Sequence, residues 1–323
     1  MRKILTITAL VLMATAMTFC LTACNDDDED GSDGGSMPSP TLTDSHGTTL
    51  QIRSLTGGVS YTFGYDEKGK LTSINSYDFT GSTFKHTDEY GTFAITVNGK
   101  GLVTKIYEKE IYDDKYGKEE GEITFNLNYS GNQLTGGTIS GSGSYESYNR
   151  DESETWTGTG SAKIVWNNGN LTRCVLESKT TFKENGKKYN ESYHGTYTIS
   201  YGNKENTFRQ MPYYLSKEIL DAEELGGVLG ALGLLGVGPK ELPSGYVLVD
   251  YDEDGDEDTE TRTYAFTQNS NGSIKTESKN SSGSIITYNY NTIGTRAALE
   301  EQFESIVPNM RGFGKKFFKR NRH

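Results

Sequence analysis

The chain has 323 residues, a formal net charge of −12 and a hydrophobic fraction of 33%. This fraction lies above that of disordered chains, so the sequence is expected to fold, and the negative charge disfavours nucleic acid as a partner. The composition, with 38 Gly, 21 Tyr and only 6 Pro, favours strands and tight turns over helices. We therefore predict an all-β protein.

The first residues have the features of a secretion signal. Arg2 and Lys3 precede an apolar run that is too short for a stable membrane span, and the run ends in LTAC, residues 21–24. These four residues resemble a bacterial lipobox, in which the cysteine is acylated before cleavage in front of it. The resemblance implies a lipoprotein signal peptide over 1–23 and acyl chains on Cys24 that hold the mature protein on a membrane. A plain signal peptide with an incidental cysteine is the alternative.

Residues 24–47 contain the acidic run NDDDED, followed by Gly, Ser and Pro. Such a segment has almost no apolar surface to bury, which is typical of a flexible tether. Its composition also resembles the acidic export signal after the lipidated cysteine in surface lipoproteins of the Bacteroidota. The resemblance implies an outer-membrane location on the cell surface, with the periplasmic face as the alternative.

A single β domain is predicted over residues 48–294. Within it, an alternating apolar strand repeatedly runs into an Asn/Asp/Gly turn, and a leucine opens the next strand. The turn glycines, of which Gly69 is the first, can adopt the positive φ that hairpin turns require. Four such units predict a repeated hairpin, and the whole domain an antiparallel meander of about 12 or more strands. The leucines are Leu71, Leu102, Leu134 and Leu171, at spacings of 31, 32 and 37 residues.

Alternation within these strands places apolar residues on one face. Phe63 and Tyr65, for example, alternate with Thr62 and Gly64. An open sheet of this size would leave its apolar face in water. We therefore expect a barrel or a strongly curved sheet with the apolar face inward.

The strand pattern stops over residues 211–245, where Leu, Gly and Ala dominate. Ser216 suits a helix start, whereas the frequent glycines weaken any single long helix. We predict two short helical pieces that cap the apolar interior, and a membrane-inserting or ligand-lining segment is the alternative. Residues 295–323 predict a C-terminal amphipathic helix and a basic tail. The leucines of the cap are Leu220, Leu225, Leu229, Leu232 and Leu235.

An acidic loop between two predicted strands is the sharpest chemical signal. Alternate aspartates followed by Gly255 match the start of a calcium-binding loop, in which carboxylates converge on one ion. The match fails at the twelfth position, which is Thr261 and not a glutamate. A solvated hairpin tip is the competing interpretation, and calcium is the one cofactor that the sequence suggests. The candidate ligands are Asp250, Asp252, Asp254, Asp256 and Glu260.

Catalytic constellations are scarce. The four histidines lie in separate units, and the chain has no phosphate-binding loop, nucleophile elbow or zinc-binding helix motif. Cys174 has no histidine near it in the sequence and is expected to be a small buried hydrophobe. The pair Glu152 and Glu154 carries little information in so acidic a chain.

Several strand–turn–strand units resemble YD-type repeat hairpins, as Tyr61, Tyr65, Asp66 and Leu71 illustrate. Together with the lipobox, the Leu/Gly insert and the closing strand ITYNYN, they resemble a Bacteroidota lipoprotein family of unknown function with a porin-like fold. The likeness covers residues 50–291 and brings no catalytic residues. Lipid-facing strands would need an uncharged apolar band, so we predict a soluble barrel carried by its lipid anchor.

Two functions remain open from the sequence. The first is a non-enzymatic binding or structural module that takes a glycan, lipid or protein ligand at the barrel mouth or on Tyr145, Tyr148 and Trp156. Cross-strand packing is the other interpretation of these rings. The second function is an extracellular polysaccharide hydrolase whose carboxylates the sequence does not identify. The lack of a catalytic motif favours the first.

Overall fold

The computed structural model describes residues 40–292, apart from 76, 81–82, 89–90, 116, 149–152, 185, 221–222, 252–256 and 281–282. The predicted signal peptide, Cys24, most of the tether, and the C-terminal helix and basic tail therefore lie outside the described residues.

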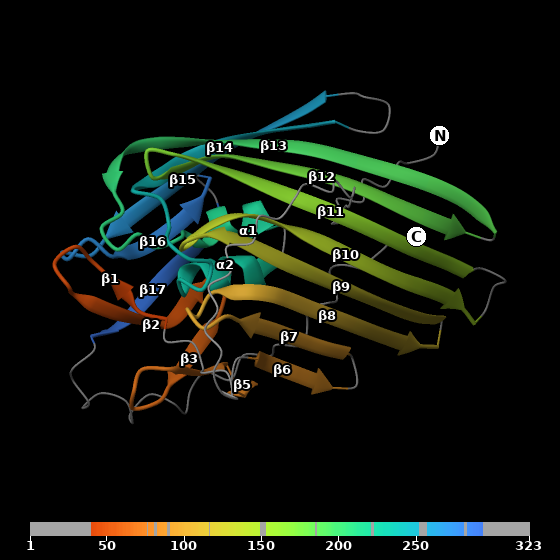
Figure 1. Cartoon of the computed structure of the whole chain (residues 1–323), viewed down its shortest axis with the longest axis horizontal. Coiled ribbons are helices and arrows are strands. Elements are labelled where there is room, and N and C mark those ends of the chain that lie inside the picture. The colour runs from red at the N-terminus through yellow and green to blue at the C-terminus, as the bar shows by residue number, and fades with distance from the viewer. Residues whose placement is uncertain are drawn as a thin grey trace, which may run out of the picture.

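The described chain is an antiparallel meander that is interrupted once by two helices, α1 (Tyr213–Leu220) and α2 (Glu223–Ala231) (Figure 1). The all-β class and the count of 12 or more strands are thereby confirmed. The strands are β1 (Leu42–Thr43), β2 (Thr49–Gly57), β3 (Tyr61–Tyr65), β4 (Leu71–Ile74), β5 (Tyr77–Thr80), β6 (Thr83–Asp88), β7 (Gly91–Val97), β8 (Val103–Asp114), β9 (Gly117–Ser130), β10 (Gln133–Ser147), β11 (Ser153–Asn167), β12 (Asn170–Glu184), β13 (Lys187–Glu205), β14 (Glu241–Tyr251), β15 (Glu257–Gln268), β16 (Ile274–Lys279) and β17 (Ile285–Thr292).

The strand pairing runs around the molecule and returns to its start. From β2 onward each strand pairs with its successor, and β17 pairs back to β2 from Ile286–Gly57 to Thr292–Leu50. In the described residues the ladder is sparse at β2–β3 and β4–β5, where two residue pairs each are in register. The sheet is therefore strongly curved and barrel-like, without an evenly closed wall. It begins earlier than predicted, because β1 lies within the expected tether and pairs with β2.

The sequence repeat corresponds to hairpins with a shared turn chemistry. In the β3–β4 turn, Oδ1 of Asp66 accepts hydrogen bonds from the backbone N–H groups of Lys68 (2.8 Å) and Lys70 (2.9 Å), and Gly69 has φ +77°. Asn98 makes the equivalent bonds in the β7–β8 turn. The leucine after each turn enters the core, with exposed fractions of 0% for Leu71, 6% for Leu102, 0% for Leu134 and 0% for Leu171.

Aromatic side chains connect neighbouring hairpins at the same end of the sheet. The hydroxyl of Tyr201 donates to the carbonyl oxygen of Leu171 at 2.7 Å, and Nε1 of Trp166 donates to that of Leu134 at 2.7 Å. Donor and acceptor are 30 and 32 residues apart, so each bond joins one repeat to the next. These bonds were not predicted from the sequence, because they depend on the register between strands.

Replacing Tyr201 with phenylalanine should lower the free energy of unfolding by about 1–2 kcal/mol, because the part-buried carbonyl of Leu171 loses a donor. Chemical denaturation of the two proteins measures this difference. Tyr189→Phe is the matched control, since Tyr189 is 46% exposed. An equal effect of the two changes would contradict the role of the inter-repeat bond.

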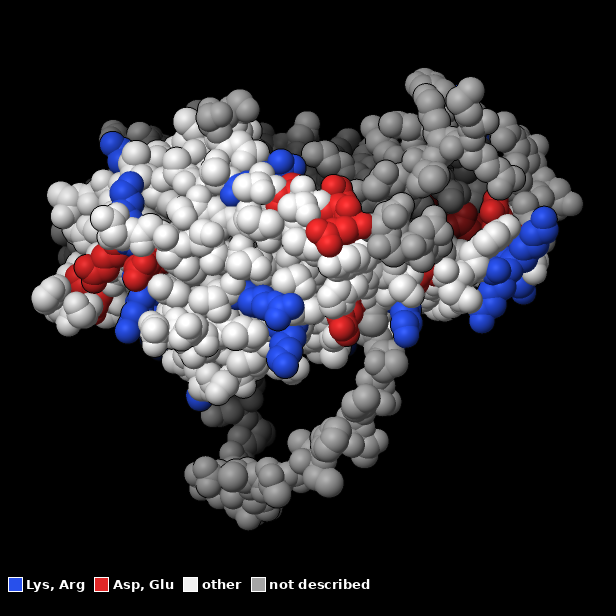
Figure 2. Space-filling model, turned by 90° about the horizontal axis from the view of Figure 1, so that it is seen from above, with Lys and Arg blue, Asp and Glu red and all other residues white. Residues whose placement is uncertain are grey.

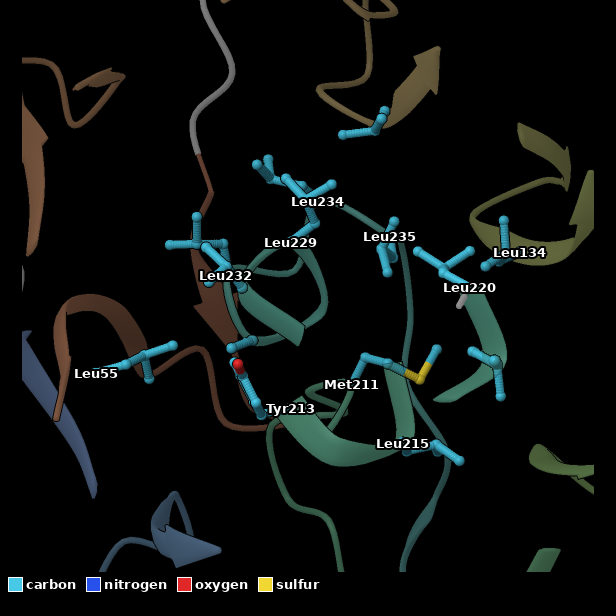
Figure 3. Packing of buried hydrophobic residues seen from close by; sticks show 14 of the residues in the cluster. Leu55, Leu134, Met211, Tyr213, Leu215, Leu220, Leu229, Leu232, Leu234 and Leu235 are labelled. Atoms are coloured by element: carbon cyan, nitrogen blue, oxygen red, sulfur yellow. The ribbon is translucent and has the colours of Figure 1, made fainter. Parts of the chain in front are cut away.

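The interior at one end is filled by residues 213–235, here called the plug. Its two helices lie inside the curve of the sheet (Figure 1), and Leu55 from β2 and Leu134 from β10 lie on two sides of it (Figure 3). This arrangement confirms the predicted helical cap, although its last residues, 241–245, begin strand β14 instead. The fully buried leucines of the plug include Leu229, Leu232, Leu234 and Leu235.

Glycines allow the two helices of the plug to pack closely. A Cβ built on Gly230 would lie 1.8 Å from Oγ of Ser216, and one on Gly227 would lie 2.5 Å from the ring of Tyr213. The sequence suggested only that these glycines weaken a helix. In the structure they provide the space that α1 needs against α2.

Candidate binding face

Strands β9 to β13, with 14 to 19 residues each, are the longest of the described strands, and together with β8 they run past the plug (Figure 1). The part of the sheet beyond the plug is here called the extended sector, and it lacks the leucine-rich filling of the other end. It comprises residues 108–114, 117–123, 139–147, 153–160, 178–184 and 187–195.

The inner face of the extended sector follows from strand alternation. Cys174 marks this face, because its Sγ lies 3.9 Å from the carbonyl oxygen of Ile219 in the plug. Cys174 pairs with Ile164 on β11 and Tyr197 on β13, and the registers continue without a shift toward the far hairpin ends. Every second residue from these positions therefore lies on the inner face.

Three aromatic side chains form a row across the inner face. Trp156 on β11 is directly opposite Phe182 on β12, which is directly opposite Tyr189 on β13. A Cβ on Gly143 would lie 2.4 Å from Nε1 of Trp156, so the indole extends over the glycine backbone of β10. Directly opposite side chains on one face are close enough to form a continuous surface. We call these three residues the aromatic row.

A buried hydroxyl and a carboxylate border the aromatic row. Thr180, two residues before Phe182, is 2% exposed, and its Oγ1 has no hydrogen-bond partner among the described residues. It pairs with Gly158 on one side and with Glu191 on the other. Buried hydroxyls normally have a partner, so the hydroxyl of Thr180 is an exception. Because it is buried, the accessible polar groups beside the row are carboxylates, of which Glu191 is one.

Carboxylates dominate the charge of this inner face. Among the described residues of the extended sector that alternation places on this face, the one cation is Lys187, at a hairpin end. Aromatic rings with convergent polar groups are typical of small-molecule and sugar binding sites. The carboxylates of the sector are Glu108, Glu110, Glu119, Glu154, Glu184 and Glu191. On the neighbouring strands β14 and β15 the same face carries Asp250, Asp258 and Glu260, and Glu260 forms an ion pair with Arg262.

The outer face of the same strands is hydrophilic. On β11 it carries Thr155, Thr157, Thr159, Ser161 and Lys163, and charged groups stand among uncharged ones on the face shown in Figure 2. Across residues 40–292, with the gaps given above, no helix is long and apolar enough to cross a bilayer.

A hollow of about 390 Å³ lies between β8 and β11 on this outer face. Its charges are largely matched with each other, since Nζ of Lys109 is 2.5 Å from Oε1 of Glu120 and Tyr107 donates to Glu122 at 3.1 Å. The hydrogen bond from Lys109 lowers the pKa of Glu120, as expected for an exposed ion pair that contributes little stability. The inner face is the stronger candidate. The hollow is lined by Lys109, Glu120, Gly121, Glu122, Ser142, Gly143, Ser144, Thr155, Trp156 and Thr157.

The predicted calcium loop lies only in part within the described residues, which omit Asp252, Asp254 and Asp256. Asp250, the residue before the end of β14, is directly opposite Asp258 on β15, and Glu260 forms an ion pair with Arg262. Within the described part of the chain, no three His, Cys, Asp or Glu residues gather in a way that could hold a metal ion. Calcium binding stays a prediction, on a loop that joins two strands as its flanks indicated.

The structure separates the aromatic residues that the sequence singled out. Tyr145 and Trp156 share the inner face of β10 and β11, whereas Tyr148 lies beyond the end of β10 and its hydroxyl donates to Asp113 at 3.1 Å. Phe182 and Tyr189 were missed, although the alternation of β12 and β13 was a signal for them. Glu154 is described, and Glu152 lies outside the described residues.

Cys174 and His194 have structural surroundings. Cys174 is fully buried, and burial raises the pKa of its thiol to about 12, which leaves it without the thiolate that a nucleophile needs. His194 Nδ1 lies 3.6 Å from the carboxylate of Glu177 across the sheet. Neither residue adjoins the aromatic row.

No family model matches the chain, and no curated protein matches it. Among solved structures, a porin-like protein from Bacteroides vulgatus ATCC 8482 is similar at 16% identity over 75% of this chain and 99% of that chain, with a TM-score of 0.44. A porin-like protein from Bacteroides uniformis ATCC 8492 is similar at 13% identity over 80% of this chain and 100% of that chain, with a TM-score of 0.27.

Proposed function

We propose that the protein is a non-enzymatic binding module, held at the outer membrane by lipid on Cys24, that binds a glycan on the inner face of the extended sector. The observation that carries the proposal is the aromatic row, which lies on a concave face beyond the plug. Rings of this kind provide flat apolar surface for the faces of sugar rings, and bordering carboxylates accept hydrogen bonds.

The polar outer face supports attachment through a lipid anchor. Strands that contact lipid carry an uncharged apolar band, whereas Lys163 and the hydroxyl side chains of β11 occupy the outer positions here. Several acyl chains at one terminus provide a durable anchor without any contribution from the strands. The cell surface is the proposed location, because a polymer ligand is accessible there.

A polysaccharide hydrolase is the second candidate, and one pair of residues favours it. Glu154 and Glu184 are directly opposite each other on the inner face, next to Trp156 and Phe182. Glycosidases use two carboxylates in unlike environments, one of them shielded from water so that it stays protonated. Glu184 lies at an exposed hairpin end, so this pair lacks the shielded partner, and binding without hydrolysis is the better-supported function.

A panel of soluble polysaccharides tests the proposal on a chain that begins at Asn25. Trp156→Ala should weaken binding of the captured glycan at least tenfold, as expected for loss of a central aromatic contact worth about 1.4 kcal/mol or more. Tyr107→Ala is the matched control, because Tyr107 lies on the outer face of β8. Affinity electrophoresis or calorimetry provides the dissociation constants.

Two results would overturn this function. Equal binding by wild type and Trp156→Ala would move the site away from the aromatic row. Release of oligosaccharides that stops in Glu154→Gln or Glu184→Gln would establish the hydrolase instead.

A further inference from the structure

A fully buried carboxylate connects the wall of the sheet to the first helix of the plug. Glu277 on β16 is 0% exposed. Its Oε2 accepts a hydrogen bond from the backbone N–H of Tyr213 at 2.8 Å, and its Oε1 accepts one from Tyr214 at 2.8 Å. The hydroxyl of Tyr288 also donates to Oε2. Glu277 therefore binds the N-terminus of α1, where backbone N–H groups lack partners within the helix.

A second contact from the same strand lies two residues further on. Nζ of Lys279 forms an ion pair with Glu218 of α1, and the hydroxyl of Tyr246 on β14 donates to the same carboxylate at 3.2 Å. The ion pair is part-exposed, with side-chain exposures of 25% for Lys279 and 15% for Glu218. Strand β16 therefore contacts α1 through a fully buried carboxylate, Glu277, and through an ion pair that water reaches.

Tyrosines surround Glu277 in the described part of the chain. In the described part of the chain no Lys, Arg or His forms an ion pair with Glu277, since Lys279 is bound to Glu218. The carboxylate is instead surrounded by phenol rings from three elements. The tyrosines concerned are Tyr213 and Tyr214 of α1, Tyr264 of β15, and Tyr288 and Tyr290 of β17.

Burial raises the pKa of Glu277 to about 7, and the three donors oppose this rise without cancelling it. If α1 moved away from β16, which we call release of the plug, water would reach the carboxyl of Glu277 and its pKa would return to about 4.5. The seated state therefore binds more protons than the released state between these values. By linkage, seating is firmest below about pH 4.5, weakens as the pH rises to about 7, and is constant above that.

We propose that Glu277 makes the seating of the plug dependent on pH, so that the helices are held more loosely above neutral pH than in mild acid. The inference concerns the plug and does not depend on glycan binding. Through this one side chain, the contact between the plug and strand β16 depends on pH.

Hydrogen exchange of the α1 amides in the full mature chain tests this inference at pH 5.5 and pH 8.0, after correction for intrinsic exchange rates. In the wild type, protection of α1 should fall by on the order of tenfold or more at the higher pH. Glu277→Gln should abolish this difference. Glu218→Gln, which removes the other attachment, should lower protection at both pH values by a similar factor.

Tyr288→Phe provides a second test that keeps the carboxyl. It removes one donor to the ionised form, so the midpoint of the loss in protection should move to higher pH. The inference is wrong if wild type and Glu277→Gln share one pH dependence, or if protection rises with pH. An unmoved midpoint in Tyr288→Phe would contradict it as well.

Discussion

Replacing Gly230 with alanine is expected to lower the free energy of unfolding by about 2 kcal/mol and Tm by about 4–8 °C. The new Cβ would lie 1.8 Å from Oγ and 2.5 Å from Cβ of Ser216, so α2 would have to move away from α1. Helix propensity acts in the opposite direction, because alanine favours a helix by about 1 kcal/mol over glycine. A variant more stable than the wild type would therefore show that the two helices are not closely packed. Thermal and chemical denaturation measure the change.

Two further variants separate packing from helix propensity. Gly202→Ala on strand β13 is the control for a glycine-to-alanine change without a clash, because nothing lies within 4 Å of a Cβ at that position. Adding Ser216→Gly to Gly230→Ala removes both clashing atoms, so the double variant should be more stable than the sum of the single effects predicts. Strict additivity would contradict contact between these two residues.

Replacing Cys24 with serine is expected to release the protein from the membrane almost completely. Serine has no thiol to acylate, and the polar outer face of the sheet offers no other hold on lipid. Fractionation of cells, followed by detection of the protein in membrane and soluble fractions, measures the change. Cys174→Ser is the matched control, since Cys174 is buried in the barrel and lies far from the terminus in sequence.

Retention of Cys24→Ser in membranes after a high-salt wash would contradict the anchor. It would mean that the strands themselves contact lipid, and the proposed location of the glycan site on an aqueous inner face would need revision. Release of both variants would point to loss of folding instead.

Local chemistry explains how much of the fold was predictable. Each turn is determined by residues close together in the sequence, such as Asp66 and Gly69, and a leucine follows the turn in all four repeats. The helical cap was likewise visible as a break in strand alternation. These features involve interactions over a few residues, which composition and periodicity record directly.

Closure and strand length were not predictable. The pairing of β17 with β2 joins residues more than 200 positions apart, and no local pattern records it. Residues 108–122 are rich in charged and polar residues, and the structure makes them part of the long hairpin β8–β9. The strands continue there with polar side chains on both faces, so the alternation of apolar and polar residues that indicates a strand is missing from the sequence.

The candidate site was predicted only in part, for a related reason. Trp156 and Tyr145 are conspicuous aromatic residues in a polar stretch. Trp156, Phe182 and Tyr189 lie in one row only because the turn of each hairpin fixes the register between its strands. A register shift of one residue would move every side chain of a strand to the other face, and the sequence alone does not fix the position of the turn. The role of Glu277 was equally hidden, since only the seated plug removes it from water.

The return of β17 to β2 affects how the molecule is made. The ring of strands cannot be completed until the last hairpin has been synthesised, and until then β2 has one edge without its partner strand. Long-range pairing of this kind slows folding and exposes strand edges to other chains. Because β17 pairs with β2, the two ends of the domain lie close together. A circularly permuted chain, which begins at another strand, would therefore keep the same strand pairing.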